Sequence, residues 1–252
     1  MSAITRVEII PLKLPIIEKD DNIATLIINA IRSENLTIED GSIFVIAHTI
    51  VSRAEGKEFH LPSLSPSPIA EHISRKTGKD SALVQLILEE ASKILKVQNN
   101  IIITKTKHGW ICANSAVDQS NSRPNCAVTL PNDSNRSAKE ICDVLSNWFK
   151  KDVSVIISDT HGRALRRGAI NVAVGSYKFS VIDDARGRKD IFGYELTSTI
   201  VALADEVCSA AELVMGQAGE MVPVVIVKGL EQRSPISNVE ELQFDDERRL
   251  FR

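Results

Sequence analysis

The sequence predicts an α+β fold in which mixed sheets are flanked by helices. Apolar runs typical of strands alternate with amphipathic segments typical of helices along the whole chain. The expected connections include both helical crossovers, which join parallel strands, and short hairpins, which join antiparallel ones. With 252 residues, the chain can form one large domain or two modest, interlocked ones.

The N-terminal part is expected to form a strand and then a helix. Residues 6–12 form an apolar run that should stop at Pro11, because proline cannot donate to a sheet ladder. Residues 22–36 place isoleucines and leucines near one helical face. Asn22 is suited to cap that helix, since its side chain can accept from a free backbone N–H.

The next part should contain one strand, a surface connection and two helices. Residues 42–47 form a continuous apolar strand, followed by a polar loop that begins at His48. Residues 61–70 are rich in proline and serine and favour a connection at the surface. Helices are expected over residues 69–78 and 80–95 from their apolar periodicity.

The second half of the chain should repeat this alternation and then end in a charged segment. In order, the expected elements are a hairpin over residues 100–118, a helix over 137–151 that begins with a capping box at Ser137, strands over 153–159 and 170–175, a helix over 194–216, and a strand over 222–229. Residues 5–231 are therefore taken as the folded module and residues 232–252 as a charged tail that frays.

Composition excludes several classes of protein. A net charge of -3 with 43% hydrophobic residues is typical of a globular protein, and two Trp and two Tyr give few platforms for stacking bases. We expect no nucleic-acid partner. No secretory signal and no long apolar stretch is present, so we expect no membrane partner and a cytoplasmic location. The four cysteines lack metal-site spacing, which favours reduced thiols.

Two aspartates follow predicted strands at positions where chemistry often takes place. Asp118 and Asp159 each lie just beyond a strand, so one sheet could bring both to the same rim. Neighbouring carboxylates repel one another unless a cation lies between them, and Mg²⁺ or Mn²⁺ would suit oxygen ligands. An aspartate beside Ser or Thr also commonly forms a turn or a helix cap, and spacing alone does not decide between the two roles.

Basic loops and a glycine loop accompany these acids. Arginine forks match phosphate and carboxylate oxygens, although such clusters also occur on solvated faces. The basic residues are Arg163, Arg166 and Arg167 after Asp159, and Arg186, Arg188 and Lys189 further on. The segment 215–221 has the glycine spacing of a flexible phosphate loop, or alternatively of a helix cap at Gly216 followed by a turn.

Five segments together resemble the coenzyme F-420-0:γ-glutamyl ligase family: "VSRAEGK", "ICANSAVDQSN", "VSVIISDTHGRALRRG", "RGRKDIFGYELTSTIVALADEVCSAAELVMGQ" and "VPVVIVKG". The resemblance spans roughly residues 7 to 230. It implies a dimeric F-420 ligase-like fold with two interlocked subdomains. It also implies a GTP-dependent ligase that joins L-glutamate to a deazaflavin acceptor with a terminal phospholactyl carboxylate, through an acyl phosphate. Family members use two sites for Mg²⁺ or Mn²⁺, often K⁺, and form homodimers.

The resemblance also assigns roles to individual residues. The positions matching metal ligands are Asp118, Asp159, Thr160 and Gln217. The positions matching nucleotide contacts are Leu12, Lys13, Leu14, Pro15, His48, Thr49, Arg53, Asn121, Met215, Gly216, Gln217, Ala218, Gly219, Glu220, Met221 and Val222. As catalytic residues we expect Arg163 and Arg167, which would hold the anionic acceptor or the glutamate carboxylates.

Three positions differ from the usual family pattern. His48 replaces a small hydroxyl residue, Arg53 replaces a lysine, and Ala116 replaces a glycine. Arg53 could still hold phosphate, and Ala116 is expected to avoid positive φ. One alternative stays open, namely a metal- and nucleotide-binding relative that acts on a different carboxylate acceptor. A structural or interaction protein is disfavoured, because it would not need acids and arginines at several strand ends.

Overall fold

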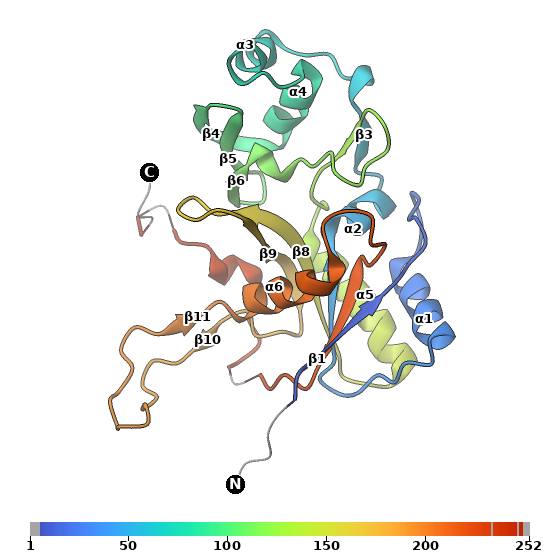
Figure 1. Ribbon diagram of the computed structural model, residues 1–252, viewed down its shortest axis with the longest axis vertical. Helices are drawn as coiled ribbons and strands as arrows, with labels where there is room; N and C mark the ends of the chain where they lie inside the picture. Colours follow the sequence, from blue (N-terminus) through green and yellow to red (C-terminus); the bar gives the residue numbers. More distant parts are fainter. Residues whose placement is uncertain (1–5, 233, 246, 249–252) are drawn as a thin grey trace.

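The computed structural model describes residues 6–232, 234–245 and 247–248. Figure 1 shows a body built around one sheet, a smaller lobe above it and a long arm that projects from the body. The sheets contain both parallel and antiparallel pairs, and helices pack on them. The predicted α+β class with mixed sheets is therefore confirmed.

The body contains a five-stranded sheet with the order β1-β12-β2-β8-β9. Its central strands β2 and β8 run parallel, and the other neighbouring pairs are antiparallel. The carboxyl ends of β2 and β8 therefore point toward the same edge of the sheet, and β2 ends opposite Ser158 of β8. The strands are β1 (Glu8–Leu12), β2 (Ile43–Ala47), β8 (Ser154–Gly162), β9 (Ala169–Tyr177) and β12 (Val224–Lys228).

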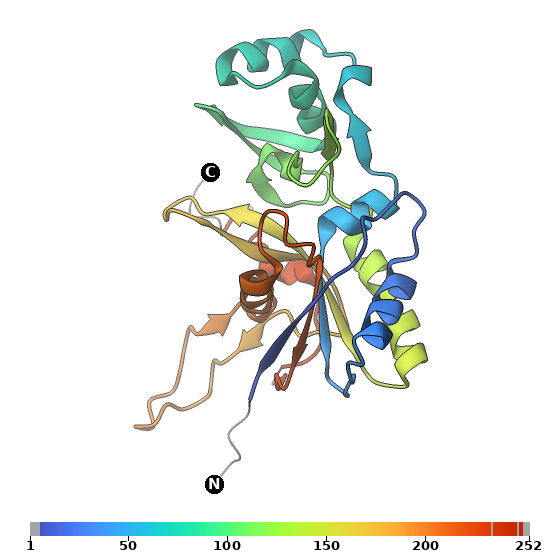
Figure 2. The same ribbon diagram turned by 45° about the vertical axis from the view of Figure 1, so that its right-hand side comes forward.

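Helices cover both faces of this sheet, as Figures 1 and 2 show. Phe44 and Ile46 belong to the core under α1 (Ile23–Ser33) and α5 (Ser134–Phe149). Ile43 and Val45 belong instead to the core under α6 (Leu203–Met215). Because β2 is buried on both faces, it appears in the sequence as an unbroken apolar run rather than an alternating one.

The lobe is formed by residues 58–128, between α2 and α5. It has its own core, in which Val84, Ile87 and Ile102 are fully buried. Its elements are β3 (Glu58–His60), a 3-10 turn (Leu61–Ser63), α3 (Pro68–Thr77), α4 (Ser81–Glu90), β4 (Ala91–Gln98), β5 (Ile101–Thr106), β6 (Ile111–Ala113), a second 3-10 turn (Asn114–Ala116) and β7 (Cys126–Val128). Strands β3 and β7 pair where the chain enters and leaves the lobe.

The arm consists of β10 (Asp183–Asp184), β11 (Ile200–Val201) and the loop between them. In Figure 1 it extends away from the body. Ile191 and Phe192 in this loop are 92% and 90% exposed. Among the described residues, no helix has the length and apolar character needed to cross a membrane.

Several predicted boundaries were wrong in the first half of the chain. Strand β1 continues through Pro11, which an edge strand tolerates because one side of it has no ladder partner. His48 begins α2 (His48–Ala54) rather than a loop. Helix α4 ends at Glu90, and the residues after it form β4, since pairing with β5 overrides their helical periodicity.

Further boundaries were wrong in the second half. Asp133, rather than Ser137, caps α5, because its carboxylate accepts from the N–H of Arg136. Strand β8 continues beyond residue 159 to Gly162, where it forms a hairpin with β9. Helix α6 begins only at Leu203, since the residues before it belong to the arm.

Part of the predicted tail packs on the body. A short 3-10 helix, η3 (Val239–Leu242), buries Val239 in the core beside α6. Residues 1–5, 233, 246 and 249–252 lie outside the described residues, and the predicted boundaries at 5, 231 and 252 stay predictions.

Candidate functional site

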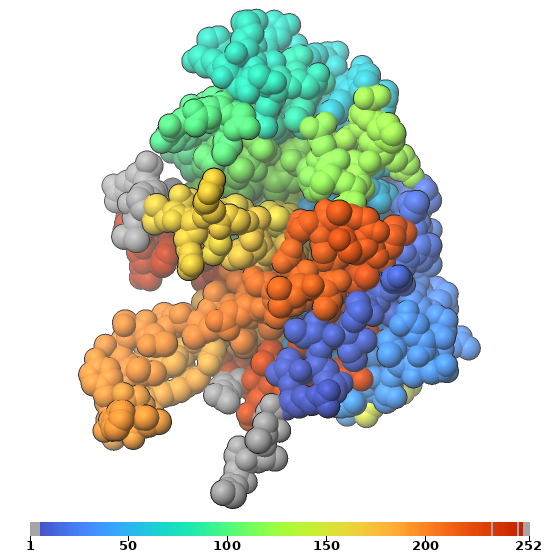
Figure 3. Space-filling model, viewed as in Figure 1, coloured from blue at the N-terminus to red at the C-terminus, as the bar shows by residue number. Residues whose placement is uncertain are grey.

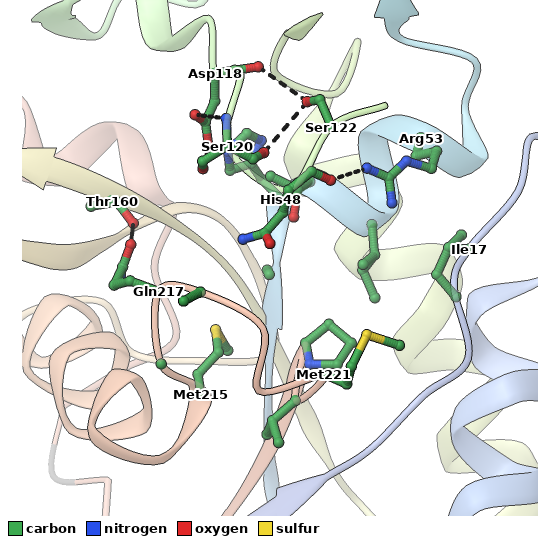
Figure 4. A pocket seen from close by; sticks show the side chains of 18 of the residues that line it. Ile17, His48, Arg53, Asp118, Ser120, Ser122, Thr160, Met215, Gln217 and Met221 are labelled. Atoms are coloured by element: carbon green, nitrogen blue, oxygen red, sulfur yellow. Dashed lines mark hydrogen bonds between the residues drawn. The ribbon is translucent and has the colours of Figure 1, made fainter. Parts of the chain in front are cut away.

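A cavity of about 390 Å³ lies at the carboxyl ends of the parallel strands, and we call it the rim pocket (Figure 4). The edge outside the carboxyl ends of strands is the usual place for ligands in open sheets. Five segments contribute to its lining: residues 14–17 after β1, residues 47–53 from β2 and α2, residues 118–123 at the lobe junction, residues 158–160 with Asn171 from the β8–β9 hairpin, and residues 215–223 after α6.

The parallel pairing of β2 and β8 brings His48 and Asp159 together. Ala47 is in register with Ser158, so the residues that follow them are neighbours. His48 Nε2 lies 3.0 Å from Asp159 Oδ1, and both side chains are largely buried. His48 Nδ1 is buried without a hydrogen-bond partner in the described structure.

Two carboxylates favour protonation of His48 by raising its pKa. Burial is the largest influence on its pKa and opposes protonation. The charge and hydrogen bond of Asp159, reinforced by the charge of Asp118, outweigh this effect and raise the pKa of His48. Asp118 and Asp159 therefore act on the same small volume although they come from different parts of the fold.

Asp118 is fixed at the junction between lobe and body. Its backbone exchanges hydrogen bonds with Val128, at 2.9 and 2.7 Å. Its carboxylate oxygens accept from the backbone N–H of Ser120 at 2.7 Å and from the Ser120 hydroxyl at 2.6 Å, contacts visible in Figure 4. This bonding leaves lone pairs of the carboxylate available to a ligand.

The turn that leads to Asp118 has a strained backbone. Asn114, Ser115 and Ala116 have φ of 54°, 55° and 57°, so the expectation that Ala116 avoids positive φ was wrong. This conformation costs a non-glycine residue about 1–2 kcal/mol. The buried Ser115 holds the turn in place, since its hydroxyl donates to the carbonyl of Ile87 at 2.8 Å.

Three oxygens converge opposite Asp118. Thr160 Oγ1 lies 3.0 Å from Asn171 Oδ1 and 3.1 Å from Gln217 Oε1. One hydroxyl proton can serve only one of these acceptors at a time, so the cluster keeps unused lone pairs. The sequence analysis missed Asn171. The available signal was that it is the single polar residue in the apolar run "INVAVG".

The loop after α6 depends on glycine for its shape. Gly216 has φ +71°, and an added Cβ there would lie 2.4 Å from Glu220 Cδ. The Glu220 carboxylate accepts from the N–H of Ala218 at 2.8 Å. Glu220 therefore stabilises the loop through this hydrogen bond without lining the pocket. Gln217 and its neighbours line the pocket.

An ion-pair cluster links the lobe, α2 and the segment after β1. Arg53 Nη2 donates to the carbonyl of Asn121 at 2.5 Å, and its Nε donates to Glu58 at 3.3 Å. Arg123 pairs with both Glu58 and Glu18. Sequence reasoning missed Arg123 and Glu58, because 65 residues separate them and no local pattern relates them.

Most of the residues predicted for the site do meet at the rim pocket. These are Leu14, Pro15, His48, Thr49, Arg53, Asp118, Asn121, Asp159, Thr160, Met215, Gly216, Gln217, Ala218, Gly219, Met221 and Val222. The predicted residues not among those lining it are Leu12, Lys13, Glu220, Arg163 and Arg167. Leu12 is a fully buried core residue, and the Arg163 guanidinium bonds the carbonyls of Arg167 and Gly168.

The donor set in the rim pocket suits a hard divalent cation. The described residues contain no group of three or more His, Cys, Asp or Glu side chains arranged for a metal. The pocket offers two carboxylates instead, together with the hydroxyl of Thr160 and the amide oxygens of Asn171 and Gln217. Mg²⁺ and Mn²⁺ prefer such oxygen donors and take further ligands from phosphate and water.

Comparisons with known proteins agree on one family. The family model described as F420-0:Gamma-glutamyl ligase matches residues 11–229. A coenzyme F420:L-glutamate ligase of Methanothermobacter thermautotrophicus is 46% identical over 216 residues, covering 86% of each chain. The protein of the same name from Methanopyrus kandleri is 45% identical over 90% of this chain and 87% of its own. That of Archaeoglobus fulgidus is 35% identical over 98% and 97%.

Proposed function

The chain belongs to the F420-0:gamma-glutamyl ligase family, and from this membership we propose that it joins L-glutamate to the deazaflavin coenzyme F-420-0 in coenzyme F-420 biosynthesis. The reaction forms an amide at the terminal carboxylate of the acceptor, and further glutamates are added through γ-amide bonds. GTP supplies the energy through an acyl phosphate. The observation that carries this proposal is the convergence of Asp118, Asp159, Thr160 and Gln217 on one cavity.

The formation of an amide from a carboxylate explains why the rim pocket would have to hold phosphate groups. A carboxylate and an amine do not condense spontaneously in water, so the carboxylate must first be activated. An acceptor carboxylate oxygen attacks the γ-phosphorus of GTP, the bond to the β-phosphate oxygen breaks, and GDP leaves. The glutamate amine, after losing a proton, then attacks the acyl carbon. The C–N bond forms as the C–O bond to phosphate breaks, and inorganic phosphate leaves.

The residues of the rim pocket are suited to hold the reactants in place. Two Mg²⁺ or Mn²⁺ ions, held by Asp118 and Asp159 and by Thr160 and Gln217, would neutralise the phosphate oxygens during transfer. His48 keeps Asp159 oriented through their 3.0 Å contact. Arg53 adds positive charge to the lining of the pocket, where it would bind phosphate groups of the nucleotide. Positioning and charge neutralisation provide most of the acceleration in such reactions.

The proposal includes K⁺ as an activating cation and a homodimer. The exposed Ile191 and Phe192 on the projecting arm support the dimer, since isolated apolar side chains at the end of an arm gain by burial against a second copy. It also keeps residues 5–231 as the ligase module, against which η3 in the segment 232–252 packs.

Mass spectrometry tests the reaction directly. Purified protein is incubated with GTP, Mn²⁺, K⁺, L-glutamate and the deazaflavin acceptor. We expect the acceptor to gain the mass of one or more glutamyl units while GDP and phosphate are released in equal amounts. ATP in place of GTP and D-glutamate in place of L-glutamate serve as controls.

Two results would contradict the proposal. Ligation that proceeds equally well without a nucleotide would remove the acyl-phosphate route. No mass gain on the deazaflavin, together with GDP release on a different carboxylic acid, would instead identify a metal- and nucleotide-binding relative with another acceptor.

A further inference from the structure

A second, larger cavity lies on the other side of the β8 terminus. Its volume is about 750 Å³, and we call it the side chamber. Asp159 lines both the side chamber and the rim pocket, so the two spaces meet at this carboxylate. Nothing in the proposed route of phosphate transfer uses the side chamber.

The walls of the side chamber are mainly apolar and partly aromatic. Ile103, Trp110 and Val172 line it together with Leu242 and Phe244. Burial, with a further contribution from Asp159, raises the pKa of the Cys112 thiol to about 12, so this residue also lines the wall as a neutral group. A volume of this size with a few polar groups is typical of a site for an organic molecule rather than for an ion.

Three parts of the chain that are distant in sequence provide most of the lining of the chamber. They are β4 to β6 of the lobe, the β8–β9 hairpin, and residues 242–244 at the end of η3 and beyond it. Figure 3 shows the yellow hairpin between the green lobe and red atoms of the C-terminal segment on one side of the molecule. The predicted tail therefore contributes a wall through Leu242, Gln243 and Phe244.

Positive charge lies around the chamber. Lys96 lines it from β4, and Ala164 lines it from the tip of the hairpin, between Arg163 and the exposed Arg166 and Arg167. An anionic chain leaving the chamber would meet these basic residues, while its reactive end would meet Asp159 and the rim pocket. Asp205 and His161 supply polar groups in the same wall.

We propose that the side chamber binds the planar ring system of the deazaflavin acceptor, with its anionic arm directed past Asp159 into the rim pocket. This inference rests on the proposed function, because it assumes that the acceptor is a deazaflavin. The ring lies against Trp110 and Phe244, and the basic hairpin tip contacts the phosphate of the arm. In this arrangement the nucleotide and the acceptor enter from opposite sides and meet at one carboxylate.

Binding measurements on three variants test the assignment. Calorimetry with the acceptor, without nucleotide, is applied to Phe244→Ala, to Val172→Trp, which fills the chamber, and to Trp148→Ala, a matched control. Phe244 is 65% exposed and Trp148 is 56% exposed, and Trp148 lines neither cavity. Loss of one stacking partner should weaken acceptor binding roughly tenfold. We expect at least this loss in both chamber variants and none in Trp148→Ala.

Kinetics provides a second measurement. In both chamber variants the KM for the acceptor should rise while the KM for GTP stays unchanged. A deazaflavin that lacks the phospholactyl arm should compete with the acceptor but not with GTP. Thermal unfolding of each variant confirms that it is folded before it is assayed.

The possible failures are distinguishable. A wild-type protein that ligates glutamate to the acceptor, while both chamber variants bind the acceptor with unchanged affinity, would overturn the chamber assignment alone. Failure of the deazaflavin without its phospholactyl arm to compete with the acceptor would also overturn the chamber assignment alone. A folded wild-type protein that never transfers glutamate to the deazaflavin would overturn the proposed function itself.

Discussion

At the scale of single residues, the site depends on one shared carboxylate. Asp159 contacts His48 on one side and lines both cavities. Its side chain is only 12% exposed, so its charge must be balanced by neighbours or by a cation. The residue that the sequence placed at the end of a buried strand is therefore the point where the two cavities meet.

Asp159→Asn should abolish most ligation. The change keeps the size of the side chain but removes the negative charge that would hold a divalent cation and that pairs with His48. We expect kcat/KM to fall by at least about a hundredfold. Initial-rate measurements with GTP and Mn²⁺ check this, with circular dichroism to confirm the fold.

Asp143→Asn is the control for that variant. Asp143 lies on the surface of α5, where it pairs with Lys139, and it lines neither cavity. Its rate should equal that of the wild type. Full GTP-dependent ligation by Asp159→Asn would show that this carboxylate binds no metal needed for the reaction.

At the scale of elements, close packing between α5 and β9 fixes the sheet beneath the site. An added Cβ on Gly175 of β9 would lie 2.5 Å from the backbone carbon of Ser134, at the start of α5. The helix can approach the strand this closely only because the strand has no side chain there. This contact keeps β9, and with it Asn171, in place.

Gly175→Ala should therefore destabilise the protein. Backbone atoms of α5 must move to admit the methyl group, so we expect the free energy of unfolding to fall by about 2 kcal/mol or more. Urea denaturation measures the change. Gly162→Ala is the matched control in the neighbouring strand, because an added Cβ there meets nothing within 4 Å. Equal stability of the two variants would contradict this account.

At the scale of the whole molecule, the site exists because the lobe is held against the body. Asp118 and Asn121 come from the lobe junction, and the pairs Arg123–Glu18 and Arg53–Glu58 connect that junction to the body. Glu58 is 8% exposed, so this cluster is better shielded from solvent than a surface pair.

Acid should weaken this connection. Burial opposes ionisation of Glu58, but hydrogen bonds from Arg123 and the charge of Arg53 outweigh it and lower its pKa below the ordinary value. A lowered folded-state pKa adds stability that is present above the unfolded-state value of about 4.3 and is lost as pH falls through the folded-state value. Glu58→Gln should cost about 1–3 kcal/mol at pH 7, and this difference should shrink at acid pH.

Urea denaturation of the wild type and of Glu58→Gln between pH 7 and pH 3 measures how their difference in stability depends on pH. Glu34→Gln, an exposed change at the end of α1, should alter stability by less than about 0.5 kcal/mol throughout. If the difference between wild type and Glu58→Gln were the same at both ends of the pH range, the proposed role of its charge would be wrong.

The projecting arm gives a prediction about assembly. Replacing both Ile191 and Phe192 with aspartate should convert the proposed homodimer into a monomer, because each apolar side chain would gain roughly 2 kcal/mol on burial against a second copy. Sedimentation analysis measures the mass. Leu213→Asp, at a position 79% exposed on α6, is the control and should stay dimeric. A dimer that survives the double change would exclude the arm as the interface.

The sequence by itself determined the strands of the central sheet and the residues at their ends. Strands β2, β8 and β12 appear as apolar runs because both faces are buried, and Asp159 and Thr160 directly follow the apolar part of β8. The five segments quoted in the sequence analysis together also indicated the family, which the comparisons confirm.

Only the tertiary structure decided which residues meet. The pairing of Asp159 with His48 follows from the parallel register of β2 and β8, and the joining of two cavities at Asp159 follows from the packing of the lobe and the C-terminal segment on the β8–β9 hairpin. Local sequence patterns report periodicity and burial, because these depend on neighbours along the chain. Contacts between Arg123 and Glu58, or between Thr160 and Gln217, depend on strand order, which no local pattern encodes.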